Sequence, residues 1–118
     1  ELLAAIGCEP VDYPEKLKCC GGGVLAVDEK LALRITQRKL DSVKARAADA
    51  MCLICPFCSI MYDTNQKKIE TDFEAQYGIP VLFYPQLLGL ALGMTPKDVG
   101  LQMNRVSAKP LLARLGLS

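Results

Sequence analysis

The chain has 118 residues, of which 51% are hydrophobic and 23% charged, with six cysteines and neither histidine nor tryptophan. A chain of this length can bury a single core without disulfides. The missing histidine excludes His-based triads, histidine acid–base catalysis, histidine-ligated haem and zinc fingers built on two cysteines and two histidines. The formal net charge of +1 gives no long-range attraction to nucleic acid or to an anionic bilayer.

The first half of the chain predicts a short helix, a strand and a long helix, in that order. Residues 1–7 are typical of the end of an amphipathic helix that stops at a glycine, and residues 9–13 predict a short strand. A polar loop follows over residues 16–23. Asp28 is then expected to cap a helix from Glu29 to about Asp49. The apolar residues predicted for the inner face of this helix are Ala32, Ile35, Leu40, Val43 and Ala47.

Two short apolar runs in the second half predict buried parallel strands, at Met51–Ile54 and at Val81–Tyr84. Between them, residues 59–77 predict a helix that ends at Gly78. The side chains expected to point inward from this helix are Met61, Ile69 and Phe73.

After the second strand, Pro85 is expected to open a helix, Thr95-Pro96 to begin another, and residues 106–115 to form a last helical segment around Pro110. Strands that alternate with helices predict an α/β fold, a small parallel sheet with helices on both faces. Ligands bind beyond the carboxyl ends of the strands in such sheets. Since both cysteine clusters follow a predicted strand, the sequence predicts a cysteine-rich metal site at that edge.

The apolar segments and the cysteine content predict a cytoplasmic protein without a membrane span. The richest apolar stretch, Pro80–Met94, is interrupted by Pro85 and Gln86 and is too short to cross a bilayer. The sequence has no signal-peptide pattern. In a reducing compartment, clustered cysteines are more often metal ligands or redox groups than disulfides.

Four of the six cysteines form two closely spaced pairs. The spacing in Cys55-Pro56-Phe57-Cys58 lets both sulfurs face one centre, as in zinc sites, iron–sulfur clusters and redox dithiols. The adjacent pair Cys19-Cys20 suits a centre with several metal atoms, because neighbouring cysteine side chains diverge. Gly21 and Gly22 let the backbone approach such a centre and present N–H groups to anionic sulfurs.

The other two cysteines are predicted to be packing residues. Cys52 lies inside the first apolar strand, and Cys8 follows the first helix stop. A free cysteine at such a position behaves as a small hydrophobic residue.

The Cys19-Cys20-Gly21 and Cys55-Pro56-Phe57-Cys58 motifs, about three dozen residues apart, resemble the cysteine-rich CCG domain. The segments Leu53–Asp63, Ile79–Gly93 and Gly100–Ser107 are similar to the C-terminal CCG domain in the B subunit of heterodisulfide reductase. The likeness covers nearly the whole chain. It implies that residues 1–118 are a single CCG-type domain and a C-terminal fragment of a longer protein, because the first cysteine of the family pattern would precede this sequence. We expect the isolated fragment to be inactive.

The resemblance implies a heterodisulfide reductase-like oxidoreductase in which this chain transfers electrons to a small disulfide through a non-cubane 4Fe-4S cluster. No catalytic residue separate from the cluster ligands is implied, and the implied partners are iron–sulfur and flavin subunits of one complex. The implied ligands are Cys19, Cys20, Cys55 and Cys58, with Gly21 and Gly22 against the cofactor.

Two alternatives remain open from the sequence. Four cysteines in two pairs also suit a structural zinc site without catalysis, and a metal-free electron-transfer or scaffold domain is the other alternative. Colour and metal content separate them, since an iron–sulfur protein is brown and a zinc protein colourless.

Tyr84 and Gln86, at the end of the second predicted strand, are additional candidates for lining the crevice.

Overall fold

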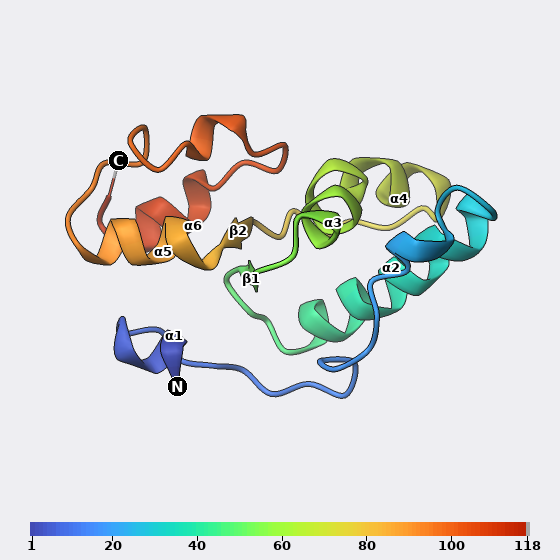
Figure 1. Ribbon diagram of the computed structural model, residues 1–118, viewed down its shortest axis with the longest axis horizontal. Coiled ribbons are helices and arrows are strands. Elements are labelled where there is room, and N and C mark those ends of the chain that lie inside the picture. The colour runs from blue at the N-terminus through green and yellow to red at the C-terminus, as the bar shows by residue number, and fades with distance from the viewer. Residues whose placement is uncertain (118) are drawn as a thin grey trace.

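The computed structural model describes residues 1–117 and shows an α/β fold around a two-stranded parallel sheet (Figure 1). Strand β1 (Met51–Leu53) pairs with β2 (Val81–Phe83), with Met51 opposite Val81. The helices are α1 (Leu2–Ala5), α2 (Glu29–Ala45), α3 (Pro56–Ser59), α4 (Gln66–Asp72), α5 (Tyr84–Ala91) and α6 (Lys109–Arg114). The predicted parallel pairing of the two apolar runs is confirmed.

Each face of the sheet is covered by its own group of helices. Met51, Leu53 and Val81 point to a core that contains residues of α2 and α4. Leu82, which alternates with its neighbours along β2, points to a second core with residues of α5 and α6. Figure 1 shows the strands between these two groups of helices. Helices on both faces of a parallel sheet were expected from the sequence, and the fold confirms them.

The long helix α2 begins where the sequence predicts and ends earlier. The carboxylate of Asp28 accepts a hydrogen bond from the Leu31 N–H at 3.0 Å, as expected of an N-cap. The helix ends at Ala45 rather than near Asp49, because Ala47 has a left-handed backbone with φ of 52°. Ala47 is therefore not on the inner face of the helix, which corrects the prediction.

The segment between the two strands is not the single helix predicted for residues 59–77. It consists of α3, a π-helical turn at Ile60–Thr64 and α4, and it ends at Asp72. The N–H of Asn65 bonds the carbonyl of Ile60, which is the wide spacing of a π turn. Met61 and Ile69 are buried as predicted, whereas Phe73 is half-buried.

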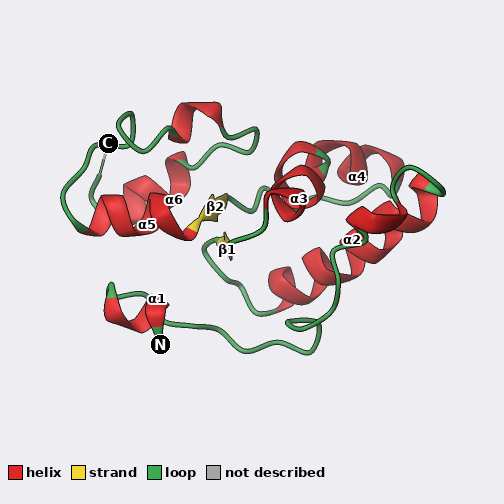
Figure 2. Cartoon of the chain, viewed as in Figure 1, coloured by secondary structure: helices red, strands yellow, loops and turns green. Residues whose placement is uncertain are grey.

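Residues 9–13 do not form the predicted strand. They lie in the long irregular connection between α1 and α2 (Figure 2). The sheet within residues 1–117 contains β1 and β2 alone, and Pro10 and Pro14 lack the N–H that a ladder needs. The Cys19-Cys20 pair therefore follows a loop rather than a strand.

The C-terminal part differs from the prediction at one element. Helix α5 and helix α6, with Pro110 in its first turn, form as expected. Thr95 and Pro96 open a turn instead of a helix, and a 3₁₀ turn follows at Leu101–Met103. Among residues 1–117, no helix combines the length and the hydropathy needed to cross a membrane.

Candidate metal centre

Two cysteine-bearing segments meet beside the carboxyl end of β1. Cys20, 7% exposed, belongs to the core that also contains residues of α2 and the π turn, and Cys58 packs against the same core. The Cys58 thiol lies next to those of Cys20 and Cys55. Cys19 and Cys55 are exposed. The four predicted ligands thus form an inner pair, Cys20 and Cys58, and an outer pair, Cys19 and Cys55.

Helix α2 holds the backbone of the Cys-Cys-Gly loop. The buried Thr36 hydroxyl donates to the Cys20 carbonyl at 2.6 Å. One turn further along, the Lys39 ammonium donates to the carbonyls of Lys18 at 2.8 Å and Lys16 at 3.0 Å. Because these bonds lie on both sides of Cys19, the main chain of the loop is attached to the helix around the first cysteine pair.

Gly21 and Gly22 allow this loop to approach its neighbours closely. Gly21 has φ of 91°, and a Cβ there would lie 2.8 Å from the carbonyl oxygen of Ala32. A Cβ on Gly22 would lie 2.9 Å from the Phe57 ring and 3.3 Å from the Cys20 sulfur. The N–H groups of the two glycines point to the Cys19 sulfur at 3.5 Å and the Cys20 sulfur at 3.4 Å.

The Cys55-x-x-Cys58 motif forms the first turn of α3, with Cys55 at its N-cap position. Main-chain N–H groups of Cys58 and Phe57 face the exposed Cys55 sulfur and lower the pKa of its thiol. Burial and the neighbouring Cys20 raise the pKa of the Cys58 thiol to about 12. The outer thiol therefore loses its proton more readily than the inner one.

Two buried polar residues beside the inner pair were not singled out from the sequence. Tyr62 is 1% exposed in the same core, and Lys39 is 8% exposed with its ammonium 5.8 Å from the Tyr62 ring centre. The position of each residue in the sequence could have indicated that it lies near the cysteines. Tyr62 follows Cys58 by four residues, the spacing of one helix face, and Lys39 lies between Thr36 and Val43 on the buried face of α2.

The residues present fit a thiolate-bound metal centre. Four sulfurs suit zinc or an iron–sulfur cluster, and an unpartnered buried hydroxyl, that of Tyr62, lies beside them. Among residues 1–117, no three cysteine or carboxylate side chains are already arranged around one point that would hold a metal ion. Ligation by all four cysteines therefore requires the exposed side chains of Cys19 and Cys55 to turn toward the inner pair.

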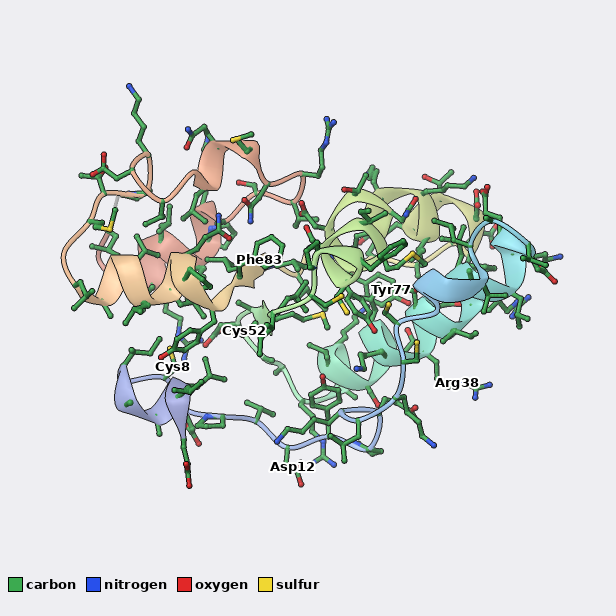
Figure 3. All side chains as sticks on the ribbon, viewed as in Figure 1. Cys8, Asp12, Arg38, Cys52, Tyr77 and Phe83 are labelled. Carbon is green, nitrogen blue, oxygen red and sulfur yellow. The ribbon has the colours of Figure 1, made fainter. Side chains whose placement is uncertain are left out.

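Cys8 and Cys52 are half-buried and lie outside these two segments. Figure 3 shows Cys8 on the N-terminal segment and Cys52 on β1. Burial, and secondly the neighbouring Cys8, raises the pKa of the Cys52 thiol.

Tyr84 and Gln86, the candidates for lining a crevice, make other contacts. The Tyr84 hydroxyl donates to the Leu2 carbonyl at 3.0 Å. The Gln86 amide accepts from the Phe83 N–H at 3.0 Å and donates to the Val99 carbonyl at 3.0 Å. Tyr84 therefore joins α5 to the N-terminal segment, and Gln86 joins the start of α5 to the loop at Val99.

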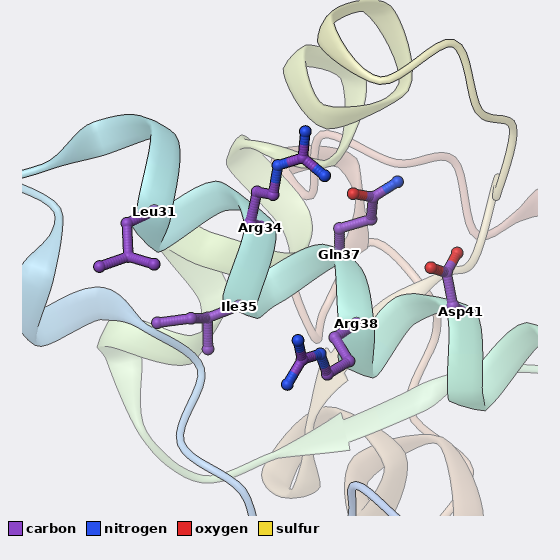
Figure 4. Close-up of a pocket in the computed structure, with 6 residues that line it drawn as sticks. All are labelled: Leu31, Arg34, Ile35, Gln37, Arg38 and Asp41. Atoms are coloured by element: carbon purple, nitrogen blue, oxygen red, sulfur yellow. The ribbon is translucent and has the colours of Figure 1, made fainter.

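A shallow surface hollow on α2 contains no cysteine (Figure 4). Arg34 and Arg38 point away from each other there, so they do not form a joint anion site. One lining residue, Ile35, lies beside the cysteine loop, since a Cβ on Gly21 would be 3.1 Å from the Ile35 Cβ. The remaining lining residues are Leu31, Gln37 and Asp41.

Comparison with known proteins places these motifs in a family context. Residues 1–63 match the model of the cysteine-rich CCG domain. Over 117 residues, 98% of the chain, it is 39% identical to the B subunit of the ferredoxin:CoB-CoM heterodisulfide reductase of Methanosarcina mazei. It is 38% identical over the same length to the B subunit of a ferredoxin- or F420H2-dependent CoB-CoM heterodisulfide reductase of Methanosarcina acetivorans.

A third relative is named for a different activity. The 8-methylmenaquinol:fumarate reductase membrane anchor subunit of Wolinella succinogenes is 29% identical over 110 residues, 93% of the chain. The chain spans 39% of the length of each of these three curated relatives.

Proposed function

The chain belongs to the cysteine-rich CCG domain family, and on this premise we propose that it supplies the ligands of an iron–sulfur centre in a heterodisulfide reductase-like oxidoreductase. The proposed ligands are Cys19, Cys20, Cys55 and Cys58, with Gly21 and Gly22 against the centre. The observation that carries the proposal is that Cys20 and Cys58, which come from two separate motifs, pack together at one core, Cys20 within it and Cys58 against it.

The local chemistry supports iron and sulfide at this site. Thiolate sulfurs are the usual ligands of iron–sulfur clusters, and the main-chain N–H groups of Gly21 and Gly22 already face sulfur atoms. A cluster held here would supply one-electron transfer. The half-buried position of Cys58 and the burial of Cys20 would keep water from one side of it.

The proposed substrate is a small disulfide. Its reduction breaks one S–S bond and consumes two electrons and two protons to give two thiols. We propose that the electrons reach this chain from iron–sulfur and flavin subunits of a larger complex. The chain spans 39% of its relatives' length, so the proposed activity is that of the assembled complex and not of these residues alone.

Metal analysis of the anaerobically purified protein tests the proposal. We expect several irons and acid-labile sulfide per chain, with a paramagnetic resonance signal. Serine replacements of Cys20 and Cys58 should remove most of the iron, whereas serine replacements of Cys8 and Cys52 provide the matched controls and should retain it. A colourless protein with one zinc per chain would support a structural zinc site instead. Equal iron loss in all four variants would contradict the ligand assignment.

A further inference from the structure

The hydroxyl of Tyr62 has no hydrogen-bond partner, and it is the one buried side-chain polar atom in this condition among residues 1–117. Its ring is 1% exposed and packs in the core that includes Cys20, with Cys58 packed against that core. A buried tyrosine hydroxyl normally finds a partner, because an unpaired one loses its hydration without compensation. The fold therefore keeps a costly unpaired donor next to the thiols.

The local backbone explains why Tyr62 faces this site. Cys58 and Tyr62 are four residues apart and share one side of the helical segment that begins with the cysteine motif. The intervening π turn buries Met61, Tyr62 and Asp63 in succession. A tyrosine hydroxyl carries its proton at neutral pH and is therefore available as a donor.

The positive charge of Lys39 lies beside the thiols of Cys20 and Cys58 and has no carboxylate partner in the described part of the chain. Its ammonium uses two donors on the carbonyls of Lys16 and Lys18, which leaves a third. No carboxylate within residues 1–117 lies at ion-pair distance from it. A buried charge is costly without a partner. Burial lowers the pKa of the Lys39 ammonium, and the neighbouring Cys58, Cys20, Cys19 and Glu15 oppose this lowering.

We propose that Tyr62 and Lys39 form the inner wall of the metal centre and set its electronic properties. The Tyr62 hydroxyl donates a hydrogen bond to a sulfur atom of the bound cluster, and the Lys39 ammonium offsets part of its negative charge. This inference rests on the proposed iron–sulfur function. Hydrogen bonds to sulfur and nearby positive charge favour the reduced, more negative cluster, so both residues raise its reduction potential.

Tyr62→Phe separates this role from ordinary packing, because it removes only the hydroxyl. In the metal-free protein we expect an unchanged or higher unfolding midpoint, since an unpaired donor disappears. In the iron-loaded protein we expect a lower reduction potential, an altered paramagnetic resonance spectrum and about 10- to 100-fold weaker retention of iron against a chelator, the range typical of outer-shell partners.

Tyr77→Phe is the matched control. The Tyr77 hydroxyl donates to Asp41 of α2 at 2.5 Å, in an exposed position. Its removal should lower the stability of the metal-free protein and leave the cluster potential unchanged. Tyr62→Phe and Tyr77→Phe are thus expected to change apoprotein stability differently.

Lys39→Gln tests the charge while keeping hydrogen-bond donors for the loop carbonyls. We expect a lower reduction potential, with Lys44→Gln as control. Lys44 also donates to a carbonyl, that of Gln76 at 2.8 Å, and lies 5.7 Å from a tyrosine ring centre, but it is exposed and near Tyr77. Lys44→Gln should leave the potential unaltered.

The outcomes distinguish this inference from the proposed function. A wild-type protein that binds no iron overturns both. An iron-containing wild-type protein whose Tyr62→Phe and Lys39→Gln variants have unchanged potential and iron retention overturns this inference alone. A Tyr62→Phe apoprotein as destabilised as Tyr77→Phe would also overturn it, because the hydroxyl would then have a partner without the cluster.

Discussion

Thr36→Val should detach the Cys-Cys-Gly loop from helix α2 with little change in side-chain shape. The Thr36 hydroxyl donates to the Cys20 carbonyl at 2.6 Å, and the hydroxyl is fully buried. It also lies 3.0 Å from the Ala32 carbonyl, but a hydroxyl has only one proton to donate. No other hydrogen bond to the Cys20 carbonyl occurs among residues 1–117. Valine therefore leaves this carbonyl unpaired.

The expected loss follows from that unpaired group. A buried carbonyl that loses its partner costs about 1–3 kcal/mol, and the extra buried methyl of valine returns part of it, up to about 0.8 kcal/mol. We expect a net loss of about 1–2 kcal/mol in the free energy of unfolding. For a domain of this size, that corresponds to a midpoint lower by roughly 4–8 °C. The iron content of the purified protein should fall as well, because Cys20 is no longer held.

Thr71→Val provides a matched control for this experiment. The Thr71 hydroxyl bonds the carbonyl of Lys67, four residues earlier in α4, at 3.1 Å, and it is exposed. Its replacement should change stability by no more than about 0.5 kcal/mol. Urea denaturation followed by circular dichroism measures both variants. Equal stabilities for the two, or a destabilised Thr36→Val with wild-type iron content, would refute the proposed attachment of the loop.

Three further changes have defined expectations. Gly22→Ala should lower the free energy of unfolding by about 1 kcal/mol and reduce the iron content, because its Cβ would lie 2.9 Å from the Phe57 ring. Gly23→Ala should change neither quantity, because the space around its Cβ is open. Iron analysis and urea denaturation of the two variants test this difference. Gln66→Leu leaves three main-chain hydrogen bonds unmade and should cost about 3 kcal/mol by denaturation, and wild-type stability would contradict the bonding scheme. Burial, with a carboxylate acceptor, raises the pKa of Tyr77 to about 12 from an ordinary value of 10.0. The protonated Tyr77 hydroxyl therefore adds its full share to the free energy of unfolding below pH 10, and this share is lost as the pH rises to about 12. If the difference in free energy of unfolding between the wild-type protein and Tyr77→Phe stays constant over this range, the pKa shift is contradicted.

The sequence predicted correctly those helices and strands that depend on residues close to one another in the chain. The Asp28 cap depends on one side chain and one N–H three residues away, and the two strands depend on apolar runs with clear boundaries. Residues 9–13 have comparable strand propensity, but a strand also needs a partner with free ladder groups, and that depends on the whole sheet. The end of α2 was misplaced because alanine gives no indication of the left-handed backbone at position 47.

The candidate site was predicted in part for a similar reason. Cysteine spacing is visible in any sequence, so the four candidate ligands could be named, although their roles stay predictions. The division into an inner and an outer pair depends on how α2 and the π turn pack, which spacing does not encode. A lysine is expected at the surface, and only the three-dimensional neighbours of Lys39 show it held against two loop carbonyls. The π turn that buries Tyr62 breaks the periodicity on which helix prediction depends.

The exposure difference between the two thiol pairs has a consequence for how such a centre is filled and damaged. Cys19 and Cys55 are the thiols that solvent reaches freely, and Cys55 is the one whose thiolate forms more readily. Incoming iron should meet these two first, and so should molecular oxygen or peroxide, because thiolates are the species that oxidise. Air damage is therefore expected to begin at Cys55 while Cys20 and Cys58 stay reduced. A protein repaired by reducing the outer pair would still contain the inner half of its site.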